Sequence, residues 1–420
     1  MRCSTHKFGG ASVRDAEAIR RVASLLVEQL GPDEKAVVVV SAMGKTTNAL
    51  EDVWRAEGAR RKELWDATVA KHVAVAVELD VDVADPLQAR MAACWEEATR
   101  AEASGDNNAA YDAFVAAGEL ASTTLVAGWL SKAGLPATWW DVRETLQTAG
   151  PHRAARVDEG TLNEAGASLR GRLSEPTGRQ VVVTQGFIGR HSDGSTSTLG
   201  REGSDYSAAL LAVAVGAQEV TIWKDVPGMM NADPKRHPEA VTVPRVDHGE
   251  ALELSYYGAS VIHPRTVKPL QQAGLALWVK SFVDPDGPAT CIDAFPGLIP
   301  DVPMFIWRDD QMWLEVFTAD GSFLAEDHLT TVFGALDESG IHVRLMQQSA
   351  THFGLLADRD EAKRTSLTSG LGRAFQVECT RDLVLLTVRH GSREDLERLT
   401  GGRTVQVEQR AGATWRRVLV

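Results

Sequence analysis

Cysteine and long apolar runs are scarce in this 420-residue sequence, and each scarcity excludes a class of protein. The four cysteines are scattered without a CxxC pair, so we expect neither a disulfide framework nor a zinc module, and no metal-ligating residues. No uninterrupted apolar run approaches the roughly 20 residues that span a bilayer. The amino end shows no signal-peptide pattern. We therefore expect a soluble, cytoplasmic protein with no membrane partner.

Positive charge is the second scarcity. The 44 Lys and Arg residues are outnumbered by 57 Asp and Glu residues, which gives a formal net charge of −13. This balance argues against a general affinity for nucleic acid. A chain this acidic binds an anionic ligand only where a few cations gather. Each Lys or Arg inside a glycine-rich motif is therefore a candidate ligand contact.

The first forty residues predict a strand, a glycine loop, a helix and a second strand. Ser12, with Asp15 three positions later, resembles a capping box that starts the helix, and Gly31 is its expected end. Ala36–Val40 is a continuous apolar run, rich in β-branched residues. Such a run is typical of a strand buried on both faces of a parallel sheet. The opening therefore predicts an α/β domain.

The rest of the chain predicts one large domain and a smaller region after it. Residues 50–135 should form several helices, after which strands and helices alternate. A stretch rich in glycine and proline at 284–303 marks the boundary, so we expect a first domain at 1–290. Residues 303–420 should hold one full βαββαβ, ferredoxin-like module at about 303–380 and a shorter second unit.

Glycine-rich segments at strand ends are the candidates for chemistry. Lys7-Phe8-Gly9-Gly10 could let the backbone approach a phosphate while the lysine neutralises its charge. Taken alone, the segment is explained equally well as a plain turn with a solvated lysine. Ser41–Asn48, Leu199–Tyr206 and Trp223–Gly228 also lie beside predicted strands or helices. Each has the same alternative, a polar turn or a helix cap.

The order of these motifs is more specific than any one of them. The matching segments are Lys7–Gly10, Ser41–Asn48, Gly118–Thr123, Asp141–Arg143, Thr184–Phe187, Gly200–Tyr206, Lys224–Gly228 and Tyr257–Pro264. Together they resemble aspartokinase over nearly all of residues 1–290. The C-terminal region is similar to the ACT regulatory modules that follow the catalytic domain in that family. The resemblance implies the amino-acid-kinase fold, a mostly parallel open sheet sandwiched by helices.

The resemblance also implies an activity, the ATP-dependent phosphorylation of the side-chain carboxylate of L-aspartate. The product, 4-phospho-L-aspartate, begins the route to lysine, threonine and methionine. Lys7 would contact the transferring phosphoryl group, and Asp205 would hold that lysine in place. Glu119 would pair with the α-amine of the substrate and Arg201 with its α-carboxylate. The other implied substrate contacts are Ser41, Thr47, Gly203 and Ser204.

ATP with Mg²⁺ is the implied cofactor. The positions that match its contacts are Gly9, Gly10, Lys224, Asp225, Met230, Lys235 and Ser260. A carboxylate substrate with a pKa near 4 is already ionised at neutral pH, so the reaction needs no general base. Catalysis then reduces to alignment and charge neutralisation by Lys7, backbone amides and Mg²⁺. His263, the histidine of the last motif, is accordingly expected to be structural.

Four positions depart from the family pattern. Ser260 stands where a phosphate-binding lysine is usual, and Lys224 where Thr or Ser is common, so we hypothesise that Lys224 supplies the lost cation. Glu202 replaces a frequent glycine. Arg344 replaces an acidic or amide residue that would help to hold the amine of an amino-acid effector. Feedback by lysine or threonine is therefore not expected.

Two alternatives to this reading remain from the sequence. Glutamate differs from aspartate by one methylene, which a pocket discriminates by only about 1–3 kcal/mol. A catalytically impaired, amino-acid-sensing regulatory protein would also explain the missing lysine. Fusion to a homoserine dehydrogenase is not expected from the length. ACT-like modules commonly pair across subunits, so the resemblance implies a homodimer.

Overall fold

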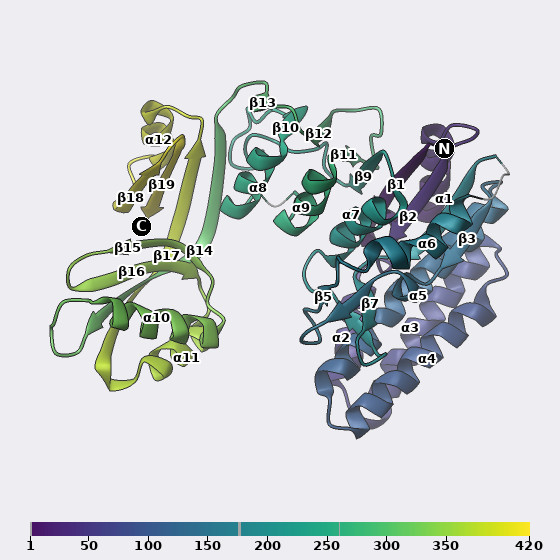
Figure 1. Ribbon diagram of the computed structural model, residues 1–420, viewed down its shortest axis with the longest axis horizontal. Coiled ribbons are helices and arrows are strands. Elements are labelled where there is room, and N and C mark those ends of the chain that lie inside the picture. The colour runs from purple at the N-terminus through teal and green to yellow at the C-terminus, as the bar shows by residue number, and fades with distance from the viewer. Residues whose placement is uncertain (1, 175–177, 260) are drawn as a thin grey trace. The chain divides into compact units, whose positions relative to one another are not determined.

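The computed structural model describes residues 2–174, 178–259 and 261–420, which form two compact units (Figure 1). Unit 1 holds the chain as far as Met229, together with Thr242–Tyr256 and the described residues 261–300. Unit 2 holds Met230–Val241, Tyr257–Ala259 and Asp301–Val420. Each unit has its own sheet and core, and we describe them separately.

A nine-stranded sheet runs through unit 1 in the order β13-β10-β12-β11-β9-β1-β2-β6-β3. Its strands are β1 (Cys3–Phe8), β2 (Lys35–Val40), β3 (Ala137–Trp140), β6 (Gln180–Gln185), β9 (Glu219–Lys224), β10 (Arg245–Asp247), β11 (Ala276–Ser281), β12 (Ala289–Asp293) and β13 (Leu298–Ile299). The six strands from β11 to β3 all pair in parallel, whereas β12 joins β11 antiparallel. The predicted mostly parallel open sheet is confirmed.

Strand β2 shows why the sequence folds this way. It is fully buried and pairs in parallel with β1 on one side and β6 on the other. A strand covered on both faces has no solvated side, so a run of valines satisfies every position. The sequence prediction for Ala36–Val40 is confirmed.

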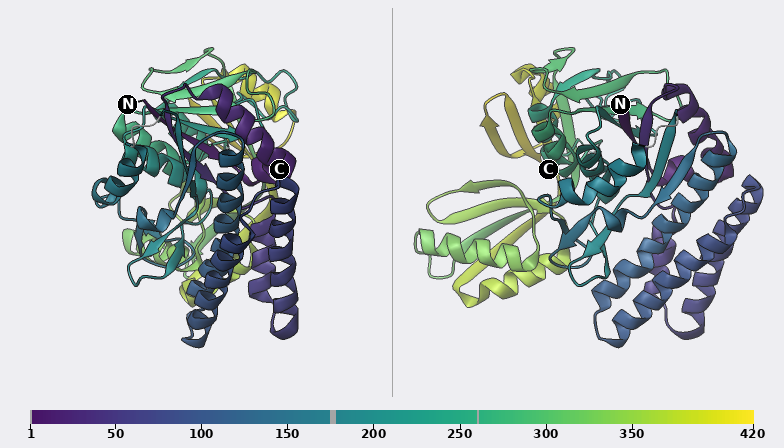
Figure 2. Two further views of the ribbon diagram at one scale, coloured as in Figure 1. Left: turned by 90° about the vertical axis from the view of Figure 1, so that its right-hand side faces the viewer. Right: turned by 45° about the vertical axis from the view of Figure 1, so that its right-hand side comes forward.

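Helices cover both faces of this sheet (Figures 1 and 2). Helix α7 packs on β1, β2 and β9 with α6 beside it, and α9 packs on β11. Helix α5 packs on β2, β3 and β6, and helices α1 to α4 all pack against α5. Their bounds are α1 (Ala16–Gln29), α2 (Thr46–Arg55), α3 (Gly58–Leu79), α4 (Ala84–Ala103), α5 (Asn107–Lys132), α6 (Leu162–Leu173), α7 (Gly203–Val215), α8 (His248–Tyr257) and α9 (Pro264–Ala273). The predicted helical stretch at 50–135 is thus α2 to α5.

Helix α5 is long and apolar enough to cross a membrane by length and composition. However, 89% of its most apolar window is buried inside the protein. A helix that is apolar on all sides is expected at the centre of a large α/β unit. We therefore interpret α5 as a core helix.

A small four-stranded sheet, in the order β5-β4-β7-β8, lies beside the carboxyl end of β6. Its strands are β4 (Gln147–Ala149), β5 (Arg156–Val157), β7 (Ile188–His191) and β8 (Thr196–Thr198). Two short 3₁₀ helices complete the unit, η1 (Gly10–Val13) and η2 (Val142–Glu144). Strand β7 pairs with β4 in parallel and with β8 as a hairpin.

The start of α1 corrects one sequence prediction. Asp15 is the N-cap, because its side chain accepts a hydrogen bond from the Ala18 N–H at 2.8 Å. Ser12 lies in η1 instead, so the loop after β1 makes a separate tight turn before the helix begins. The predicted end at Gly31 is also wrong, since Leu30, in extended conformation, is the C-cap.

Unit 2 is built on one six-stranded antiparallel sheet, ordered β15-β16-β14-β17-β19-β18. Its elements are β14 (Met304–Thr318), α10 (Glu326–Ser339), β15 (Val343–Gln348), β16 (His352–Asp358), α11 (Glu361–Leu371), η3 (Gly372–Ala374), β17 (Phe375–Arg389), α12 (Arg393–Thr400), β18 (Val405–Ala411) and β19 (Thr414–Leu419). The order β14-α10-β15-β16-α11-β17 is the predicted βαββαβ unit. Strands β14 and β17 extend beyond this unit, where they also pair with each other through Met304–Arg308 of β14.

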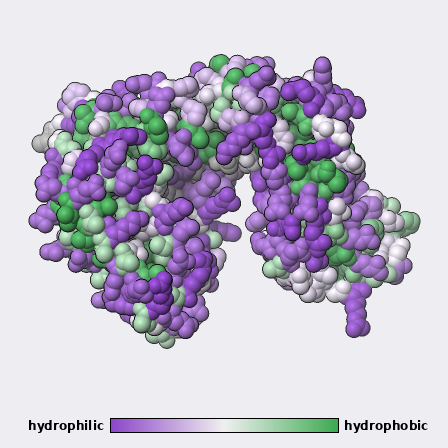
Figure 3. Space-filling model, turned by 180° about the vertical axis from the view of Figure 1, so that it is seen from behind, coloured by the Kyte–Doolittle hydropathy of each residue, from purple (hydrophilic) through white to green (hydrophobic). Residues whose placement is uncertain are grey.

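Hydrophilic residues predominate on the face drawn in Figure 3, and hydrophobic ones form small separate groups. This surface agrees with the net charge of −13.

Candidate active site

A cavity of about 510 Å³ lies in unit 1 at the carboxyl ends of β1, β2, β6 and β9. Open α/β sheets bind ligands at this edge, because loops leave every parallel strand there. Nine residues singled out from the sequence line it: Lys7, Ser41, Thr47, Glu119, Arg201, Gly203, Ser204, Asp205 and Lys224. The structure therefore brings the motifs after four separate strands together around one space.

Two lysines share one buried carboxylate at the floor of the cavity. Lys7 Nζ lies 2.6 Å from Asp205 Oδ1, and Lys224 Nζ lies 3.1 Å from Asp205 Oδ2. Burial raises the pKa of Asp205, but the two ammonium groups outweigh it and hold that pKa below its ordinary value. With two cations and one anion the cluster has a net positive charge. It can attract an anionic ligand while Asp205 fixes both amines.

The start of helix α7 adds backbone donors to the same cavity. Gly203, Ser204 and Asp205 form its first turn, and the free N–H groups of a helix start attract anions. Glu202 precedes them with a φ of 55°, in the left-handed region that glycine occupies without strain. This backbone geometry explains why glycine is frequent at this position in the family pattern.

Gly10 fits a close contact between the loops that follow β1 and β2. A Cβ atom there would lie 2.7 Å from the Ala42 carbonyl oxygen and 2.8 Å from that of Gly44. The Gly44 N–H also donates to the Gly10 carbonyl at 2.9 Å. Gly9 differs, because its φ is −77° and a Cβ would have its nearest contact, Lys7 Nζ, at 3.6 Å. Of these two glycines, Gly10 is therefore the one that has no room for a side chain.

Glu119 is an uncompensated buried acid. It projects from α5 into the cavity, it is 3% exposed, and its Oε2 atom has no hydrogen-bond partner. Burial raises the pKa of Glu119 to about 8, although the Ala42 N–H and Lys7 act in the opposite direction. An orphaned buried carboxyl is costly unless a ligand pairs with it. A ligand ammonium group is the partner with the right charge.

Three other predicted positions, Asp225, Met230 and Lys235, are not among the residues that line this cavity. Asp225 follows β9 and is exposed. Met230 and Lys235 belong to unit 2, and Lys235 is exposed. Ser260 lies outside the described residues. His263 caps helix α9 by accepting the Arg265 N–H at 3.2 Å, which confirms a structural role.

Sequence reasoning missed four lining residues, Glu51, Tyr111, Arg153 and Thr198, and it gave no role to Phe187, which lies in a matching segment. Glu51 lies one helical turn after Thr47, and this spacing could have revealed it. Tyr111 donates to Glu51 at 2.8 Å, and the Arg153 guanidinium lies 4.0 Å from the centre of the Tyr111 ring. No sequence signal marks Arg153, because the fold alone brings its loop beside α5.

Known proteins resemble this chain in sequence and in fold. The pattern of the Amino acid kinase family matches residues 5–281. The chain belongs to this family. Bifunctional aspartokinase/homoserine dehydrogenase 2 of Escherichia coli is 36% identical over 294 residues, and the match covers 69% of this chain but only 35% of that protein. Lysine-sensitive aspartokinase 3 of E. coli is 32% identical over 398 residues, covering 91% of this chain and 86% of that protein.

The fold agrees with the sequence match. The crystal structure of E. coli aspartokinase III in complex with aspartate and ADP superposes with a TM-score of 0.81 and 27% identity. The match covers all of this chain and 96% of that one. Within the amino acid kinase family, this chain is therefore similar to aspartokinases along its whole length.

Proposed function

We propose that this protein transfers the γ-phosphoryl group of ATP to the side-chain carboxylate of L-aspartate, giving 4-phospho-L-aspartate and ADP. The observation that carries the proposal is the single cavity holding a two-lysine cluster and an unpaired buried acid. In this cavity the ammonium group of a phosphoryl acceptor would meet Glu119, and the transferring phosphoryl group would meet the two lysines. The resemblance to a structure bound to aspartate and ADP supports the same reading.

Charge neutralisation is the main task of the protein in this reaction. The nucleophile is ionised at neutral pH, so no residue has to remove a proton from it. Lys7 and Lys224 would stabilise the charge on the transferring group, and the N–H groups at the start of α7 would add to it. Because Asp205 holds both amines before the ligand arrives, the cluster needs little rearrangement during transfer.

The substrate would be held through its α-groups. Glu119 would bind the ammonium group and Arg201, exposed at the cavity rim, the α-carboxylate. Ser41, Thr47, Gly203 and Ser204 line the same space and can supply hydrogen bonds. Acids that lack an amine would leave Glu119 without a partner, so they should bind poorly.

The nucleotide would use Gly9, Gly10 and Lys224, and we keep Asp225, Met230, Lys235 and Ser260 as proposed contacts. Mg²⁺ would enter with the nucleotide and would offset part of the charge of its phosphates. The donor set fits a phosphate-held ion, because Asp205 is already engaged by two lysines. The chain's own contribution is to position the phosphates.

Aspartate-dependent ADP release by the purified chain tests this proposal. We expect turnover with aspartate and at least tenfold lower kcat/KM with glutamate, in line with a pocket that differs by one methylene. Lys7→Ala should abolish turnover. Aspartate binding without any turnover would instead favour the regulatory alternative, and equal turnover of both acids would refute the assigned substrate.

A cytoplasmic homodimer, paired through the ACT-like region, completes the proposal. Unit 2 exposes several large hydrophobic side chains, among them Phe323, Phe333 and Met346 at 75%, 46% and 51%. Such residues are enriched where subunits meet. Sedimentation velocity should give the mass of two chains, and a single-chain mass at every concentration would contradict the dimer.

A further inference from the structure

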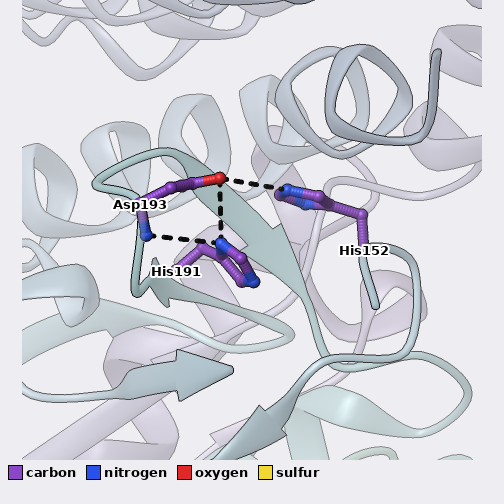
Figure 4. Close-up of side chains that lie close together, drawn as sticks. All are labelled: His152, His191 and Asp193. Carbon is purple, nitrogen blue, oxygen red and sulfur yellow. Dashed lines mark hydrogen bonds and ion pairs between the residues drawn. The ribbon is translucent and has the colours of Figure 1, made fainter. Parts of the chain in front are cut away.

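Three metal-ligating side chains converge beside the cavity, far apart in the sequence (Figure 4). His152 lies in the loop between β4 and β5, His191 ends β7, and Asp193 lies in the turn to β8. One ligand atom from each of the three residues can be chosen so that all lie within 4.8 Å of one another. Asp193 Oδ2 lies 3.0 Å from His191 Nδ1 and 3.8 Å from His152 Nε2. No cofactor or substrate role proposed above uses these residues.

The second nitrogen of His152 is fixed by an acid from α5. His152 Nδ1 lies 3.0 Å from Asp112 Oδ2. Asp112 also accepts the N–H groups of Arg153 at 2.9 Å and Thr198 at 3.0 Å, so its oxygens act as acceptors. The Nδ1 atom of His152 therefore carries the proton, and Nε2 presents a lone pair. An acid that orients a histidine in this way is common behind metal ligands.

The ring of His191 is oriented by the backbone. Its Nε2 lies 2.9 Å from the Gly150 carbonyl oxygen, which can only accept, so Nε2 carries a proton. Its Nδ1 receives only a long hydrogen bond of 3.5 Å, from the Asp193 N–H. The lone pair of Nδ1 therefore faces the same space as Nε2 of His152.

The two carboxylate oxygens of Asp193 have different partners. Its Oδ1 accepts the Ser195 N–H at 2.8 Å and the Ser195 hydroxyl at 2.5 Å. Its Oδ2 faces the two rings, 3.0 Å from His191 Nδ1 and 3.8 Å from His152 Nε2. The oxygen that faces the rings therefore takes no part in the bonds to Ser195 and can serve as a ligand atom.

Without an ion, either these three atoms face one another as acceptors or His191 carries a second proton. A proton on His191 Nδ1 would satisfy only the contact between His191 and Asp193. It would leave His152 Nε2, which is buried on a side chain only 8% exposed, without any hydrogen-bond partner. A single metal ion would satisfy all three atoms.

We propose that His152 Nε2, His191 Nδ1 and Asp193 Oδ2 bind one divalent transition-metal ion of the Zn²⁺ class. Two imidazoles and one carboxylate suit zinc better than Mg²⁺ or Ca²⁺, which prefer oxygen alone. Zinc ligands about 2.0–2.1 Å from the ion stand roughly 3.3 Å apart in a tetrahedron, close to the two measured separations. Asp193 is half exposed, so water can take the fourth position.

The ion would act as a clip between two loops. It would tie the β4–β5 loop to the β7–β8 hairpin through three ligands. Arg153, next to His152, and Thr198, at the end of β8, both line the cavity and both donate to Asp112. The scattered positions in the sequence explain why no metal site was predicted. This inference does not depend on the proposed kinase activity.

Zinc uptake by the whole, chelator-stripped chain tests the site. Titration of Zn²⁺ against a chromophoric chelator should show one equivalent bound per chain in the absence of nucleotide. Co²⁺ should give the visible absorption of a tetrahedral site with nitrogen and oxygen ligands. Because protons compete with the ion for the histidine nitrogens, uptake should strengthen as pH rises.

Two variants and one control decide the outcome. Asp193→Asn keeps the side-chain shape and the bonds to Ser195 but removes the charge. His152→Ala removes the buried ligand. We expect each to weaken Zn²⁺ at least tenfold and to lose the Co²⁺ spectrum. His342→Ala, at an exposed histidine of unit 2, should change neither.

Failure of the unmutated chain to take up one equivalent would overturn the proposal. So would a variant that binds as tightly as the unmutated chain. If His152→Ala does not fold, as judged by circular dichroism, Asp193→Asn decides alone.

Discussion

At the residue scale, the charges around Asp205 determine what the cavity can hold. A buried carboxylate with one lysine would leave a neutral pair, whereas Lys224 adds the second cation. The family pattern has a lysine at the position of Ser260, and we hypothesise that Lys224, at the end of β9, supplies the cation instead. Lys224 reaches Asp205 from β9, next to β1 in the sheet.

Removing that cation should reduce the chemical step. We expect Lys224→Ala to lower kcat by about 10²-fold, the usual cost of losing one donor to developing charge. Lys224→Arg, which keeps the charge, should recover part of the loss. Steady-state ADP release measures both, with Lys268→Ala on α9 as the surface control. Unchanged kcat and unchanged KM for ATP in Lys224→Ala would disprove the role of this lysine.

Glu119 gives the substrate affinity a specific pH dependence. Its pKa is raised from 4.5 to about 8, so below pH 8 the carboxyl is mostly protonated and cannot pair with an ammonium group. The KM for aspartate should therefore fall as pH rises, by up to tenfold per unit, and level off above pH 8. Glu119→Gln should give a high KM that does not change with pH between 6 and 8. A pH-independent KM in the unmutated protein would contradict this assignment.

At the element scale, the site depends on how closely the loops after β1 and β2 approach. The contact is made by backbone, with Gly10 between two carbonyl oxygens. These loops carry Lys7 and Ser41 to the cavity. A change in their spacing should therefore alter both the stability of unit 1 and the geometry of the site.

A matched pair of glycine substitutions measures this contact. Gly10→Ala places a methyl group within 2.8 Å of two carbonyl oxygens and should destabilise the protein by about 1–3 kcal/mol. Gly9→Ala, which meets nothing closer than 3.6 Å, should change stability little. Urea denaturation compares the two. Equal stabilities would mean that the loops separate at no cost.

Elements with a strong local signal could be predicted from the sequence. The valine run of β2 and the βαββαβ order of unit 2 were both visible as patterns. The start of α1 was not, because Ser12 and Asp15 are both good caps and only the fold of the β1 loop decides between them. The lysine cluster was predicted through family motifs, whereas Arg153 and the His152 cluster depend on contacts between distant segments.

At the scale of the whole molecule, unit 2 forms one continuous sheet because β14 and β17 pair with each other along most of their length. Arg344 lies on β15 at its edge, and its guanidinium pairs with Asp358 Oδ2 at 2.5 Å. We expect this cation to disfavour the amine of an amino-acid effector, even with Asp358 beside it.

Lysine and threonine should therefore fail to regulate this protein. Isothermal titration of either amino acid into the full chain should give no binding heat, and neither should inhibit turnover. Aspartate, titrated into the same preparation, should bind and serves as the control. Saturable binding of lysine or threonine with inhibition would show that Arg344 does not block an effector site.

The central claim is that the cavity makes an acyl phosphate of aspartate. Hydroxylamine converts such a product into a stable hydroxamate, which mass spectrometry identifies directly. With ATP, Mg²⁺ and aspartate, the unmutated chain should accumulate aspartyl β-hydroxamate, and Lys7→Ala should not. No hydroxamate from the unmutated chain, or the same amount from Lys7→Ala, would contradict the account.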